Sequence, residues 1–142
     1  MNTKKFLMGT IVGGITFFLV GYLIYGIALM SFFTQHSTAP AGTMKAMGDF
    51  VWWALILGNL ASGALLTYIF LKMGNINSFG AGAGVGAVIG FFMELSTDAV
   101  HYATENSSDF TGVCVDVIAG LILTAIAGGI IGAALGMGNK KP

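Results

Sequence analysis

The sequence predicts an all-α fold, a four-helix transmembrane bundle with up-down-up-down topology, and three observations support this. Of the 142 residues, 56% are hydrophobic and only 8% are charged, whereas soluble domains carry about 25% charged residues. The mean hydropathy is +0.85. Four apolar stretches are long enough to cross a bilayer, which takes about 20 residues per helix. These properties disfavour a soluble domain and favour a single membrane domain over residues 1–142.

We place the four spans in order at 6–33, 50–72, 80–103 and 110–137. The first and last are long for a hydrocarbon core of roughly 30 Å, so we expect them to tilt or to project beyond it. The first span follows a pair of lysines, as in a signal peptide, but its apolar run exceeds the 7–15 residues of a signal core. We therefore expect this span to be retained in the membrane.

Short polar connectors separate the later spans and set their topology. Residues 73–79 and 104–109 form two such connectors, and connectors this short make the helices they join antiparallel neighbours. Ser107, Ser108 and Asp109 directly precede the fourth span. These residue types are preferred at helix N-caps, so we expect one of them to cap this helix.

The lysines predict the orientation of the bundle. One side of the predicted topology carries nearly all of them, and the other carries one lysine and three acidic residues. The first side holds Lys4, Lys5, Lys72, Lys140 and Lys141, and the second holds Lys45, Asp49, Glu105 and Asp109. Cytoplasmic loops carry the excess of positive charge. We therefore expect a multi-pass protein of the inner (plasma) membrane with both termini in the cytoplasm.

Small residues repeat at a spacing of four in several spans and predict close helix packing. Helices in lipid associate through such faces, where backbones approach closely. The candidate packing glycines are Gly9, Gly13, Gly82, Gly86, Gly90, Gly128, Gly132 and Gly136. Two interpretations stay open at this point. The glycines either pack the four helices of one chain or form the interface of a homo-oligomer or a larger membrane complex.

Composition also excludes several functions. The formal net charge is zero and the chain has no arginine, so the basic surface of a nucleic-acid-binding protein is missing. Cys114 is the only cysteine, which excludes an intrachain disulfide. We find no Ser/His/Asp arrangement, phosphate-binding loop or strong metal motif, and we do not expect an enzyme. The lipid bilayer is the expected partner.

Ionisable residues inside the spans are the candidate functional residues, because charges at membrane depth are costly and usually face a bundle interior or a watery cavity. Glu94, Asp98 and His101 fall within an arc of about 60° on one face of the third helix, which Thr97 borders. Asp116 enters from the fourth helix. Both aspartates are expected about 7–9 Å below the same outer surface. The spacing therefore predicts an acidic, histidine-containing pocket that opens outward.

Three interpretations of this pocket remain open. Glu94, Asp98, His101 and Asp116 could ligate a divalent metal cation, because carboxylate and imidazole are suitable ligands. They could instead share protons, because carboxylates this close do not all ionise. In the third interpretation they are hydrated or hydrogen-bonded and purely structural. The leading functional hypothesis is a protein that binds or conducts a cation or proton. The alternative is an accessory subunit that docks through its glycine-rich faces.

Three stretches also carry a family likeness. They are the first-span run Phe18–Gly26 with the later segment Met44–Gly48, the small-residue opening Gly82–Gly90 of the third span, and Val115–Gly120. Together they resemble the domain-of-unknown-function family 1761, a group of short bacterial four-span membrane proteins. The resemblance implies an integral membrane protein and supports the position of Asp116. It brings no activity, ligand or cofactor.

Overall fold

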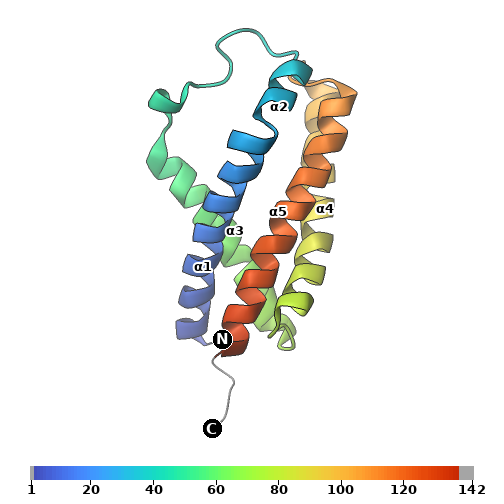
Figure 1. Cartoon of the computed structure of the whole chain (residues 1–142). Helices are drawn as coiled ribbons and strands as arrows, with labels where there is room; N and C mark the ends of the chain where they lie inside the picture. The colour runs from blue at the N-terminus through green and yellow to red at the C-terminus, as the bar shows by residue number, and fades with distance from the viewer. Residues whose placement is uncertain (1, 138–142) are drawn as a thin grey trace.

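The computed structural model describes residues 2–137 and confirms the predicted fold class. Four helical stretches are long and apolar enough to cross a membrane, and each of these spans runs antiparallel to the next one along the chain (Figure 1). The elements in chain order are α1 (Thr3–Gly21), the π-helix η1 (Tyr22–Ala28), α2 (Met30–His36), the 3-10 helix η2 (Met47–Asp49), α3 (Trp52–Met73), α4 (Phe79–Thr104) and α5 (Phe110–Met137). Three of the four predicted spans match observed helices within two residues at each end.

The first span departs from the prediction of one helix over 6–33. Its α-helix ends at Gly21 and continues as the π-helical η1, where the Leu29 N–H donates to the carbonyl of Ile24, five residues back, at 2.8 Å. Leu29 itself leaves helical geometry, with φ −108° and ψ 4°, before α2 begins. A π-helical stretch fits an extra residue into the turn and is frequent at functional sites. The regular α-helix of the first span is therefore interrupted near the C-terminal end of the span, at Leu29.

Two tight helix pairs form the bundle, α4 with α5 and α1 with α3, and contact between α1 and α5 joins them. On α4, Gly86 lies against the α5 backbone, since a Cβ there would be 2.5 Å from the carbonyl oxygen of Thr124. On α1, a Cβ at Gly13 would be 2.8 Å from the Cα of Gly63 on α3. Approach this close is possible only because these residues lack a side chain.

The other predicted packing glycines also face neighbouring segments of the same chain. Gly82 and Gly90 meet α5, and Gly128 meets α4. Gly132 and Gly136 lie against the backbone at Ser78 and Asn77, and Gly9 lies against Thr67. The structure thus places all eight glycines at contacts within one chain, while an oligomer interface stays a prediction.

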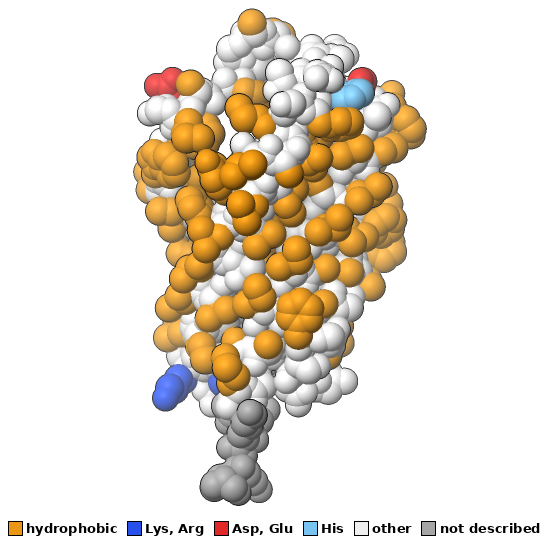
Figure 2. Space-filling model, viewed as in Figure 1, with side chains coloured by type: hydrophobic (Ala, Val, Ile, Leu, Met, Phe, Trp, Pro, Cys, Tyr) orange, Lys and Arg blue, Asp and Glu red, His pale blue; other side chains and the backbone are white. Residues whose placement is uncertain are grey.

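Charged side chains mark the two ends of the bundle. Figure 2 shows a broad hydrophobic belt between an end that carries lysine and an end that carries acidic and histidine side chains. We call these the lysine end, with the start of α1 and the end of α3, and the acidic end, with α2 and the α4–α5 connector (Figure 1). Lys140 and Lys141 lie outside the described residues. The cytoplasmic assignment of the lysine end stays a prediction.

The apolar core lies toward the lysine end. Its most deeply buried members include Leu66 and Phe70 of α3 and Ala127 and Ile131 of α5. Toward the acidic end α3 diverges from α4 and α5 (Figure 1), and its first two turns, Trp52–Leu57, are exposed. The half of the bundle at the acidic end is therefore more open than the half at the lysine end.

Candidate functional site

A hydrogen bond inside the membrane-spanning region links the first and last spans. The Tyr25 hydroxyl of η1 donates to Asp116 Oδ1 of α5 at 2.7 Å. Both residues are half-buried. Asp116 lies in the second turn of α5, and the π-helical geometry of η1 sets the angle at which Tyr25 leaves its helix. The pair places a carboxylate at the interface of two helices.

Two further carboxylates approach this pair from α4. The Glu94 side chain lies directly over Gly120 of α5, because a Cβ at Gly120 would be 2.6 Å from Glu94 Cδ. One turn later, Asp98 is only 9% exposed. Each of the two lies within electrostatic range of Asp116. We call Tyr25, Glu94, Asp98 and Asp116 the intramembrane acid cluster.

The carboxylates of the acid cluster are not balanced by hydrogen-bond donors or positive charges of the surrounding side chains. Asp98 Oδ2 is buried and has no hydrogen-bond partner among residues 2–137. None of the described residues donates a hydrogen bond to Glu94, and none of the lysines at 4, 45 and 72 forms an ion pair with the cluster. His101 does interact electrostatically with Asp98, but it is exposed. A buried carboxylate without a partner is costly, so protonation or a cation must offset it.

The expected four-ligand metal site is not formed. Within the described part of the chain, no three His, Cys, Asp or Glu side chains are arranged to hold a metal ion. The helix explains this, because Glu94 and His101 are separated by about 10 Å along its axis, whereas a Zn²⁺ ligand lies only about 2 Å from its ion. Thr97, also predicted at the pocket, is exposed. The divalent-metal interpretation is therefore dropped.

The described residues line two hollows, one at the acidic end and one inside the bundle. The larger, of about 340 Å³, is lined by Lys45, Phe50, Val51 and Leu55, where α3 diverges, and holds no acidic group. The smaller, of about 70 Å³, lies between the helices and has Glu94 in its wall. The smaller hollow therefore belongs to the acid cluster, and the larger one does not.

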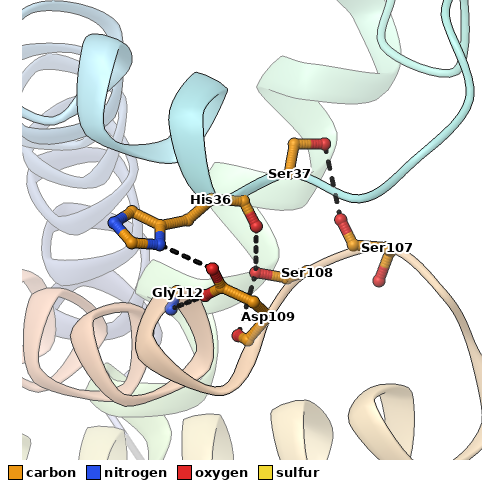
Figure 3. A network of polar contacts seen from close by, with 6 residues as sticks. All are labelled: His36, Ser37, Ser107, Ser108, Asp109 and Gly112. Atoms are coloured by element: carbon orange, nitrogen blue, oxygen red, sulfur yellow. Dashed lines mark hydrogen bonds and ion pairs between the residues drawn. The ribbon is translucent and has the colours of Figure 1, made fainter.

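A second polar network ties α2 to the start of α5 at the acidic end (Figure 3). His36 Nδ1 lies 2.7 Å from Asp109 Oδ2, and the Asp109 N–H donates to the His36 carbonyl at 3.0 Å. The other carboxylate oxygen, Oδ1, accepts from the Gly112 N–H at 2.8 Å and caps α5, so the predicted cap is Asp109. Ser108 donates to the His36 carbonyl at 3.4 Å. This network holds the broken first span against α5.

We expect the Asp109 contacts to stabilise the fold in a pH-dependent way. The Gly112 N–H and then the His36 imidazole hold the pKa of Asp109 below its usual value. A carboxyl with a lowered pKa stabilises the fold above its ordinary titration range, near pH 4, and loses this effect as the pH falls through the lowered pKa. Asp109→Asn should therefore unfold at a lower temperature than wild type at pH 7, and this difference should become smaller as the pH falls to 3.

Thermal unfolding followed by circular dichroism across this pH range measures the effect. Asparagine caps helices as well as aspartate does, so Asp109→Asn removes the charge and keeps the cap. Asp49→Asn, at the same end but outside the network, is the control and should show no pH-dependent difference. An Asp109→Asn deficit that is equally large at pH 3 and pH 7 would contradict the proposed role of the charge.

Sequence reasoning missed two of these contacts. Tyr25 entered only as part of a family likeness, and nothing in its apolar surroundings indicated a bond to Asp116. His36 was not among the candidate site residues, and the structure pairs it with Asp109. The sequence did contain one signal for the second contact: His36 and Asp109 both flank membrane spans at the same end of the predicted bundle.

Comparison with protein-family models, with curated proteins and with solved structures finds no significant match to this chain. The class that fold and site define is a small four-span membrane protein with an intramembrane acid cluster. Membership in family 1761 stays a prediction.

Proposed function

We propose that this protein binds a proton or a monovalent cation at the intramembrane acid cluster and does not act as an enzyme. One observation carries the proposal. Tyr25, Glu94, Asp98 and Asp116 converge from three elements, and none of the described residues forms an ion pair with them. Ionisable groups inside spans are functional candidates by default because they are costly to keep there.

Charge balance supports binding over a purely structural role. A buried structural carboxylate is normally satisfied by donors of its own fold. Even Asp109, at the end of the bundle, is paired with Gly112 and His36. Asp98 has no such donor at Oδ2. Three carboxylates this close favour a bound proton or cation, because the bound charge reduces their mutual repulsion.

The fold also supports exchange with the acidic end. Asp98 lies two turns from the end of α4, and α3 diverges on this side of the bundle (Figure 1). Tyr25 belongs to the π-helical segment η1, a type of helix that is frequent at functional sites. With the lysine end in the cytoplasm of the inner membrane, as the lysines indicate, the cluster opens to the opposite side.

Infrared difference spectroscopy of the reconstituted protein tests the proposal, because it distinguishes carboxylic acids from carboxylates. We expect a carboxylic acid band that changes with pH or on addition of a monovalent cation, and that is lost or shifted in Asp116→Asn. Glu105→Gln, exposed in the α4–α5 connector, is the control. A folded Asp116→Asn with the wild-type spectrum would contradict the proposal and favour a structural role.

A further inference from the structure

The small hollow beside Glu94 is built by all four membrane spans. Its volume is about 70 Å³. Its wall is mostly apolar, and its polar side chains are Glu94 of α4, Ser62 of α3 and Thr124 of α5. The full lining is Phe17, Ser62, Leu65, Leu66, Ile89, Gly90, Met93, Glu94 and Thr124. Gly90 lets α4 approach Thr124 closely, since a Cβ there would be 2.6 Å from Thr124 Cβ.

The polar groups of this wall offer only hydrogen-bond acceptors. The Ser62 hydroxyl donates its proton to the Gly58 carbonyl at 3.1 Å, and the Thr124 hydroxyl donates to the Gly120 carbonyl at 2.8 Å. Each hydroxyl therefore has only lone pairs left for a ligand. The ionised Glu94 carboxylate is also an acceptor only, and no described residue donates to it. A wall of this kind recognises a ligand that donates.

Charge and size narrow the ligand further. Glu94 is the only ionisable residue in the wall, so one positive charge balances the site. The volume holds about two water-sized groups, which excludes bulky organic cations. A bare metal cation requires a shell of oxygen ligands, which the apolar remainder of the wall does not supply. An ammonium group instead combines one charge with several N–H donors.

We propose that this pocket binds an ammonium group, either the free ammonium ion or the head of a small primary amine. The N–H donors pair with Glu94, Ser62 and Thr124, and Phe17 and Met93 pack beside a methyl substituent. One turn from Glu94, the buried and unpartnered Asp98 Oδ2 adds further negative potential. The inference rests on the proposed function and names the ligand class of the same site.

Isothermal titration calorimetry of the full chain in lipid nanodiscs tests this, with methylammonium, ammonium, tetramethylammonium and sodium chlorides at equal ionic strength. We expect methylammonium and ammonium to bind, with their relative affinities distinguishing amine from free ion. Sodium and tetramethylammonium should bind at least tenfold more weakly, because sodium lacks N–H donors and tetramethylammonium lacks both donors and a fitting size. Equal binding of all four salts, or no binding of any, overturns the proposal.

Two variants locate the site. Glu94→Gln should weaken methylammonium binding at least tenfold, while Glu105→Gln, which changes the other glutamate of the chain, should bind as wild type does. Ser62→Leu should also abolish binding by filling the pocket while Glu94 keeps its charge, which covers the case in which Glu94→Gln does not fold. Wild-type binding in a folded Glu94→Gln or Ser62→Leu overturns the assignment. If methylammonium does not bind while Asp116→Asn still alters the infrared spectrum, only this inference fails and the proposed function stands.

Discussion

Gly82→Leu is expected to prevent the four-span bundle from folding. The α-carbon of Gly82 faces α5 so closely that a Cβ would overlap the carbonyl oxygen of Gly128, and it would also lie 3.1 Å from the Cα of Gly132. Both obstacles are backbone, so no rotamer change can relieve the clash. The helices would have to separate along one of the closest backbone contacts of the fold. Overpacking usually costs about 1–3 kcal/mol, and we expect a larger cost here because the obstacles are backbone atoms.

Gly84→Leu is the matched control, because it makes the same substitution two residues further along the same helix. Gly84 is exposed, and nothing lies within 4 Å of a Cβ there. Denaturing-detergent titration followed by circular dichroism, with size-exclusion chromatography, should show a folded Gly84→Leu and an unfolded or aggregated Gly82→Leu. If Gly82→Leu is folded and as stable as Gly84→Leu, the α4–α5 contact is not the one described here.

The helical architecture could be predicted almost entirely because bilayer thickness imposes it. Apolar runs of sufficient length between polar connectors gave span ends within two residues of the observed ones for three spans. The first span was predicted as one helix because its composition contains no proline to mark a break. The π-helical turn before Leu29 depends on which carbonyl an N–H selects, and hydropathy carries no information about that choice.

For the candidate site, helix periodicity predicted which residues share one helix face, but not which side chains meet across helices. Glu94 and Asp98 share a face of α4 because they are four residues apart, and similar depth predicted that Asp116 would lie near them. Periodicity cannot show which side chains meet across helices, so the bond from Tyr25 to Asp116 was missed. It also suggested a metal site, since residues on one helix face are aligned along the axis but do not converge on a point.

We expect Asp98→Val to increase the stability of the protein and to impair the acid cluster at the same time. Asp98 is 9% exposed and its Oδ2 has no partner among residues 2–137. An unsatisfied buried polar group costs about 1–3 kcal/mol. Valine has a similar volume and carries no polar atom. Denaturing-detergent titration should therefore show a gain of about 1–3 kcal/mol in the free energy of unfolding, with a loss of part of the pH-dependent infrared signal.

Thr97→Val is the appropriate comparison, because it replaces an exposed neighbour on the same helix by the same residue. Its effect should stay within about 0.5 kcal/mol, as for most surface substitutions. A residue kept at a cost to stability is typical of binding sites, where activity and stability oppose each other. If Asp98→Val is instead less stable than wild type, the carboxyl group is satisfied in the native protein. Asp98 would then be a structural residue, and the acid cluster would reduce to Tyr25, Glu94 and Asp116.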